Sequence, residues 1–396
     1  PNKDHPSDEP DRGASLTFAM PADLTVASNG VLSGSEPVEH PDGRAFTRWS
    51  WRVANPINSY TITLNAAPYV FMEEPYVSTA GDTMPIQFWV LPEFEEQGRR
   101  LFPQFASQIR FFEELLGPYP FRNEKYGVAH SSYLGMEHQT LIAYGADFTD
   151  GNMFDLPIGF DDLHQHELAH EWWGNLVTAW DWRDFWLHEG FGTYMQALYA
   201  EHLMGEEGYN LVMDRLRERI AGTQEIVPDG FQTTKGVYGS GRGGDIYYKG
   251  AWILHTLRGV VGYDAFFRIL SEFAYPTAES RTRTDGLQTR FASSTDFITL
   301  SEEISGLDLG AFFELYLHHA ALPRLAVERD GTELRLWWSD LPEGIDLTLP
   351  VELLVGSDLR TVQVGVEPVE TRVPRRAMFT PDPNHRILKA LPPSTP

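Results

Sequence analysis

The sequence predicts a multidomain α+β fold, with a partial N-terminal β domain, a mostly helical middle domain and a C-terminal β-sandwich. Three observations lead to this prediction. The chain has 396 residues, more than one ordinary hydrophobic core accommodates. Short runs of β-branched and aromatic residues dominate both ends of the chain, whereas apolar residues between them recur three and four positions apart. We place the domains at residues 1–84, 85–318 and 319–396.

The composition describes a globular protein with an acidic surface. Hydrophobic residues make up 42% of the chain, and 11 Trp, 16 Tyr and 24 Phe are enough for large cores. The formal net charge of −25 argues against a nucleic-acid partner or an anionic-lipid surface, because both require clustered Lys and Arg. The absence of cysteine excludes disulfides and thiolate ligands, so any metal ligands must be His and carboxylate.

No run of about 18 apolar residues occurs, so we expect no transmembrane segment and a soluble chain. The chain begins at Pro1 without an initiator Met and without a hydrophobic targeting segment. These features are typical of a fragment or processed form, and they predict no particular compartment.

The N-terminal part contains short strand-like runs separated by Pro, Gly, Asn and Asp. The Asn29-Gly30 pair is a tight-turn signal. We expect strands within residues 16–20, 24–32, 45–53, 59–71 and 85–91.

From about residue 93 the apolar period becomes helical, and the first amphipathic helix should end at Gly117-Pro118. Strand-like residues then flank the segment 135–138. The Gly-rich segment 236–244 lacks the Gly-Lys-Ser/Thr ending of a phosphate loop and is expected to be a flexible surface loop. Further helices are expected within residues 192–205, 208–222, 247–262, 263–275 and 309–320.

Beyond Leu322-Pro323 the pattern returns to strands with turn residues between them, which predicts a small β-sandwich. The expected strands lie within residues 324–330, 333–339, 347–357, 361–368 and 385–391.

The strongest chemical signal is an H-E-x-x-H pentad that begins at His166 and ends at His170. On a helix, residues four apart share one face, so both imidazoles can bind one metal ion. Glu189, in a segment suited to a second helix packed antiparallel to the first, would supply the third ligand. Two His, one Glu and an open position for water form a catalytic zinc arrangement. We therefore expect one Zn²⁺ per chain.

Glu167 follows the first ligand by one residue, about 100° round the helix, and can reach a water at the metal without ligating it. Its expected role is general base. His164 and His188 flank the ligands but do not share their spacing, and we interpret both as structural. The alternative to a metal site is that the pentad belongs to a surface helix without a metal and that Glu189 is a solvent-exposed charge.

Several segments together resemble the gluzincin zinc aminopeptidases, the family of alanyl aminopeptidase N and leukotriene-A hydrolase, over essentially the whole chain. The resemblance implies a thermolysin-like, mostly helical catalytic domain that hydrolyses peptides with a free N-terminus. The segments occur in the family's order: ASNGVL at 27–32, GMEH at 135–138, HELAHEWWGNLVT at 166–178, WLHEGFGTY at 186–194, YYKGA at 247–251 and STDF at 294–297.

The resemblance also assigns substrate contacts. It implies that Gly135 and Met136 pair with the substrate backbone, that Glu137 holds its free α-amine, and that Tyr247 stabilises the transition-state oxyanion. Without the resemblance, Glu137 is a charged turn residue and Tyr247 and its neighbour pack a helix start. The sequence departs from the family at His138, where the family has Asn, and at Leu134-Gly135, where the family has Gly-Ala or Gly-Gly.

In the family, strands that precede the segment matching residues 4–10 supply further pocket contacts. We expect the missing N-terminal part of the same protein to be a partner of this chain. Two other functions stay open: a zinc endopeptidase or epoxide hydrolase on the same site, and a noncatalytic zinc-bearing peptide-binding module. Residue preference at the cleaved end and the oligomeric state are not predicted.

Overall fold

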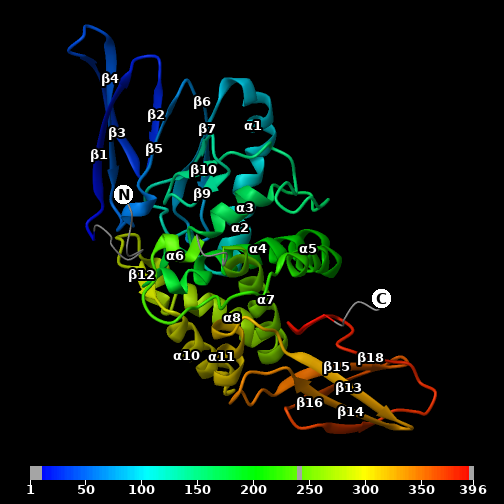
Figure 1. Cartoon of the computed structure of the whole chain (residues 1–396). Helices are drawn as coiled ribbons and strands as arrows, with labels where there is room; N and C mark the ends of the chain where they lie inside the picture. Colours follow the sequence, from blue (N-terminus) through cyan, green and yellow to red (C-terminus); the bar gives the residue numbers. More distant parts are fainter. Residues whose placement is uncertain (1–10, 239–242, 392–396) are drawn as a thin grey trace.

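The computed structural model describes residues 11–238 and 243–391. Figure 1 shows strands at the N-terminal end, helices around a sheet in the middle, and a second group of strands at the C-terminal end. The predicted multidomain α+β architecture is confirmed. The domain limits stay predictions, and strand β7 (Thr83–Val90) crosses the first limit while pairing with strands on both sides. No helix within the described ranges is long and apolar enough to cross a membrane.

The N-terminal strands form two separate sheets. One has the order β1-β4-β3 and the other pairs β2 with β5. Asn29-Gly30 therefore links two sheets and does not join a paired hairpin, although Gly30 has the expected positive φ of 71°. The bounds are β1 (Ala14–Pro21), β2 (Thr25–Ser28), β3 (Val31–Glu39), β4 (Ala45–Val53) and β5 (Leu64–Ala67).

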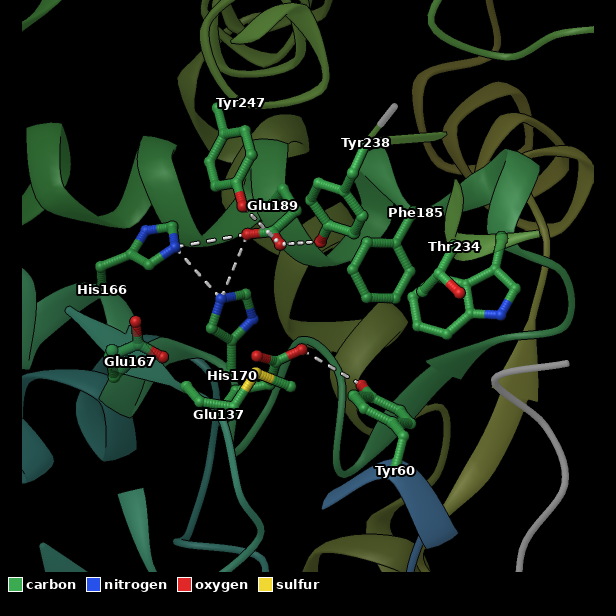
Figure 2. A pocket seen from close by; sticks show the side chains of 13 residues that line it. Tyr60, Glu137, His166, Glu167, His170, Phe185, Glu189, Thr234, Tyr238 and Tyr247 are labelled. Carbon is green, nitrogen blue, oxygen red and sulfur yellow. Dashed lines mark hydrogen bonds and ion pairs between the residues drawn. The ribbon is translucent and has the colours of Figure 1, made fainter. Parts of the chain in front are cut away.

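The expected strand at 59–71 was wrong at its start. Residues Ser59–Thr61 form the 3₁₀ turn η1, because the Thr61 N–H and hydroxyl both donate to the Asn58 carbonyl oxygen, at 3.0 and 2.9 Å. This turn directs the Tyr60 hydroxyl toward Glu137, in a pocket that both residues line (Figure 2).

A mixed sheet of order β6-β7-β8-β10-β9 supports the central part. The single helix expected after residue 93 is in fact divided into η2, α1 and α2, and α2 begins at Pro103, which has no N–H to continue the ladder of α1. The bounds here are β6 (Val70–Val77), η2 (Pro92–Phe94), α1 (Glu95–Leu101), α2 (Pro103–Leu115), β8 (Tyr126–His130), β9 (Gly135–Met136) and β10 (Ile142–Tyr144).

Helices α4 to α11 lie between this sheet and the C-terminal strands (Figure 1). Each helical stretch expected between residues 192 and 320 overlaps an observed helix. Helices α6, α9 and α10 were not expected. The helical bounds are α3 (Asp162–Ala169), η3 (Trp182–Asp184), α4 (Trp186–Met204), α5 (Glu206–Arg219), α6 (Thr234–Tyr238), α7 (Gly243–Val261), α8 (Tyr263–Ala274), α9 (Ala278–Thr282), α10 (Ser294–Ser305) and α11 (Gly310–His318), with β11 (Val177–Ala179) parallel to β12 (Arg290–Ala292).

The C-terminal strands form two sheets, of order β13-β14-β17 and β16-β15-β18, with alternating buried residues as a sandwich requires. The strand expected at 385–391 was wrong. This segment instead docks on helices, where the Leu388 N–H donates to the Thr256 hydroxyl and the Tyr316 hydroxyl donates to the Leu388 carbonyl. The bounds are β13 (Arg324–Asp330), β14 (Glu333–Ser339), β15 (Leu349–Val355), β16 (Asp358–Val364), β17 (Val369–Arg372) and β18 (Phe379–Pro381).

Two glycines set the closest approach of α4 and α7, the helices that carry Glu189 and Tyr247. A Cβ built on Gly250 would lie 2.9 Å from Gly190 Cα, and a Cβ on Gly190 would lie 2.9 Å from Gly250 Cα. Real side chains do not tolerate this distance from backbone atoms, so the crossing depends on the absence of both side chains.

Gly250→Ala should therefore lower the free energy of unfolding by about 1–3 kcal/mol, because the added methyl group pushes two backbones apart. Gly259→Ala on the same helix is the matched control, since its Cβ would meet no atom closer than 3.5 Å. We expect the control to leave stability unchanged or raise it by up to about 1 kcal/mol. Urea denaturation of both variants compares them, and equal stability would contradict the proposed packing.

Candidate active site

Helix α3 carries the pentad and is buried along its whole length. Asp161 begins it: its carboxylate accepts the His164 N–H at 2.8 Å, a cap that stabilises a helix by about 1 kcal/mol. Asp162 in the first turn suits the positive end of the helix dipole. A short, polar helix of this kind keeps its shape because its surroundings bury and hydrogen-bond it.

The three expected metal ligands meet at one point, with His166 on α3, His170 at the C-cap of α3 and Glu189 on α4 (Figure 2). The two Nε2 atoms are 3.1 Å apart. Each lies 3.4 Å from Glu189 Oε2. Donor atoms about 2.0–2.1 Å from a tetrahedral zinc are about 3.3 Å apart, so this separation suits one ion.

Two hydrogen-bonding details also fit a metal. Glu189 Oε2 is buried and has no hydrogen-bond partner among the described residues, as expected for an oxygen that a cation would occupy. His170 Nδ1 lies 2.9 Å from the Trp173 carbonyl oxygen, and donation to that oxygen leaves the Nε2 lone pair for a metal. Two imidazoles and a carboxylate are a donor set typical of zinc.

Glu167 lies beside His166 without bonding to it, with its carboxylate at the cavity (Figure 2). Gly135 is directly against it: a Cβ on Gly135 would be 2.2 Å from Glu167 Oε1. Burial is the main cause that raises the pKa of Glu167 well above its usual value; the charge of His170 lowers it, and that of Glu137 raises it.

Two tyrosine hydroxyls donate to the other oxygen of Glu189. Tyr247 on α7 and Tyr238 on α6 lie 2.8 and 2.7 Å from Oε1. Tyr238 was not predicted as a site residue, because it belongs to the segment expected to be a loop. Within the segment 236–244, residues 236–238 belong to α6 and residues 243–244 to α7, so the predicted loop was wrong at both ends; its middle, residues 239–242, lies outside the described residues.

Glu137 lies across the cavity from Glu189, with its Oε1 accepting the Tyr60 hydroxyl at 3.3 Å (Figure 2). Gly135 and Met136 form the short edge strand β9 next to it. The cavity has a volume of about 410 Å³. Besides the expected residues, it is lined by Tyr60, Trp182, Phe185, Thr234 and Tyr238. Sequence patterns missed these five because they come from three separate segments, at η1, around η3 and in α6.

The two flanking histidines are held by packing, as expected. His164 lies between Gln108 Oε1 and the Tyr126 hydroxyl, both at 2.7 Å, and stacks on Phe105. His188 Nε2 accepts the Ala179 N–H at 2.8 Å. Burial lowers the pKa of both to about 3, so they are neutral.

Comparison with known proteins gives a family match. The model of the peptidase family M1 domain matches residues 105–314 of this chain. Mitochondrial aminopeptidase 2 of Saccharomyces cerevisiae is 25% identical over 343 residues, which cover 82% of this chain and 33% of the yeast protein. Aminopeptidase N of Streptomyces lividans is 25% identical over 350 residues, which cover 82% of this chain and 38% of that protein. This chain thus matches over little more than a third of the length of these relatives.

Solved structures share the fold. Aminopeptidase A of Legionella pneumophila, in complex with aspartic acid, has a TM-score of 0.70 at 20% identity and covers 98% of this chain and 46% of its own. An M1 zinc metallopeptidase from Deinococcus radiodurans has a TM-score of 0.59 at 23% identity and covers 78% of this chain and 64% of its own.

A second group of side chains, Glu137, Glu167 and His170, also places one donor atom each within 4.8 Å of the others. Zinc titration against a competing chelator separates the two groups. We expect Glu189→Ala to weaken zinc binding by more than the ~10–100-fold that outer-sphere changes cost, because it removes a ligand. Glu137→Ala, the matched control, should bind zinc as the wild type does. The reverse order of affinities would place the metal in the second group.

Proposed function

The chain belongs to peptidase family M1, and from this premise we propose that it is a zinc-dependent aminopeptidase that removes N-terminal residues from peptides, with one zinc ion per chain. The observation that carries the proposal is the carboxylate of Glu137, buried in the same cavity as the ligand triad and hydrogen-bonded to Tyr60. A metal site alone supports peptide hydrolysis. A second, fixed carboxylate beside it supports recognition of a free amine.

A count of charges supports this specificity. Glu137, Glu167 and Glu189 bring three carboxylates into the cavity, and the described residues that line it include no Lys or Arg. Metal binding requires neutral imidazoles, so with His166 and His170 neutral and all three carboxylates ionised, a divalent ion would leave the site with one negative charge. A peptide's N-terminal ammonium compensates this charge, whereas an internal peptide group would leave Glu137 buried and unpaired. The cavity therefore favours the end of a peptide chain over its interior.

We assign His166, His170 and Glu189 as the residues that would hold zinc. When bound there, zinc would supply a Lewis acid that polarises the substrate carbonyl and lowers the pKa of water. Glu167 accepts a proton from the attacking water and delivers it to the nitrogen of the leaving amine. Gly135 allows this carboxylate to lie against β9, where we expect the substrate backbone to pair with Gly135 and Met136.

Tyr247 donates its hydroxyl proton to the carbonyl oxygen as that oxygen gains negative charge. This hydroxyl now donates to Glu189 Oε1 and must leave that oxygen to act. Tyr238 donates to the same oxygen, so Glu189 keeps a hydrogen-bond donor while Tyr247 turns to the substrate. Burial, and then the charge of Glu189, keep the pKa of Tyr247 well above its usual value, so the phenol is protonated and can donate.

An aminoacyl anilide compared with its N-acetylated form tests the amine specificity. The wild type should cleave the free amine far faster, because acetylation removes the charge that pairs with Glu137. Glu137→Gln should lower kcat/KM for the free amine by about 10–100-fold, as expected for loss of a buried, charged hydrogen bond of about 1.5–3 kcal/mol. Equal cleavage of the two anilides by the wild type would refute the aminopeptidase assignment.

Glu167→Gln tests the general base. The amide is isosteric with the carboxylate but cannot accept the proton, so kcat should fall by about 10²–10⁴-fold. Zinc affinity, measured by chelator competition, should stay close to that of the wild type because Glu167 is not a ligand in the proposed site. Undiminished turnover in this variant would refute the role of Glu167 as general base.

A further inference from the structure

The turn that carries Glu137 is held in an unusual backbone conformation. Thr140 has a φ of +59°, a region that β-branched residues rarely occupy. The whole turn is buried, from Glu137 to Thr140, so hydrogen bonds to water do not offset the strain at Thr140. A strained residue persists only when its surroundings hold it, and such residues concentrate at functional sites.

Glu171 holds this turn from the side of the metal-binding helix. It directly follows the ligand His170, and its Oε1 accepts the Thr140 N–H at 2.8 Å. Its Oε2 accepts the Tyr119 hydroxyl at 3.1 Å, so both oxygens are engaged and the carboxylate is fixed. One buried side chain thus joins the end of the metal-binding helix to the turn that positions Glu137.

Other contacts hold the turn from two more directions. Thr140 Oγ1 accepts the Gly30 N–H at 2.8 Å, and the Asn29 amide donates to the Gln139 carbonyl at 2.6 Å. The Asn175 amide donates to the Glu137 carbonyl at 3.2 Å. The link between the two N-terminal sheets therefore supports the site, although no residue of that link lines the cavity.

We propose that Glu171 is a positioning residue that fixes the distance between Glu137 and the metal ligands by holding Thr140 in its strained conformation. It thereby sets how much of a peptide fits between the bound ammonium and the bond that is cut. This inference rests on the proposed aminopeptidase function. It adds a residue that touches neither substrate nor metal and acts through the turn.

The readout is the preference for an aminoacyl anilide over its N-acetylated form, given as the ratio of the two kcat/KM values. Glu171→Ala frees the turn, and this ratio should fall by at least about tenfold, because misplacement of a substrate contact by about 1 Å can cost up to 10²-fold. The loss should appear mainly as a higher KM for the free amine. Zinc affinity by chelator competition should stay near the wild-type value.

Two variants separate positioning from general stability. Glu171→Gln keeps an oxygen that can accept the Thr140 N–H and should restore most of the preference. Asp382→Ala is the matched control: it removes another buried carboxylate, which accepts the Arg386 N–H at 2.6 Å and shares no partner with Glu171, and it should lower the melting temperature without changing the preference.

If Glu171→Ala does not fold, Thr140→Gly tests whether the free-amine preference depends on a fixed turn. Glycine adopts a φ of +59° without a steric penalty, so this variant should fold. It keeps the N–H that bonds Glu171, but it lacks the hydroxyl that binds Gly30 and removes the strain by which that bond constrains the turn. The free-amine preference should fall here too. An unchanged preference in the folded variants would overturn the role of Glu171. A wild type without any preference would instead refute the proposed function itself.

Discussion

Glu189 contacts both imidazoles through one carboxylate oxygen and two tyrosine hydroxyls through the other. This buried carboxylate joins α3, α4, α6 and α7 at a single group. Removing it from water is costly unless cations and donors surround it, so the four helices must meet where they do. The rest of the site depends on this carboxylate. It orients the imidazoles of His166 and His170, and its hydrogen bond with Tyr247 holds that hydroxyl at the cavity.

Close approach of backbones makes this arrangement possible. Gly190 and Gly250 let α4 and α7 touch, Gly135 lets β9 lie against Glu167, and a Cβ on Gly192 would be 3.2 Å from the His166 ring. Each glycine lies beside a residue with a proposed chemical role. The small residues thus bring the functional side chains within range, and the buried Glu171 and Thr140 then fix the remaining distance, between the metal end of the cavity and Glu137.

Features with local periodicity could be predicted from the sequence, and contacts between distant segments could not. The H-E-x-x-H pentad fixes its own geometry on a helix, and the strands 45–53, 324–330 and 333–339 lie where their alternation predicts. Residues 385–391 have the composition of a strand but bond to helices, because tertiary contacts override local propensity. Tyr60, Tyr238 and Glu171 gave no signal because their roles come from partners 77, 49 and 31 positions away.

A crystal structure of the Glu167→Gln variant with zinc and a peptide substrate tests the central claim most directly. Anomalous scattering at the zinc edge should give one peak at ligand distance, about 2.0–2.2 Å, from His166 Nε2, His170 Nε2 and Glu189 Oε2. The peptide's ammonium group should contact Glu137. A zinc peak among Glu137, Glu167 and His170, or a peptide bound with its interior against Glu137, would contradict the account.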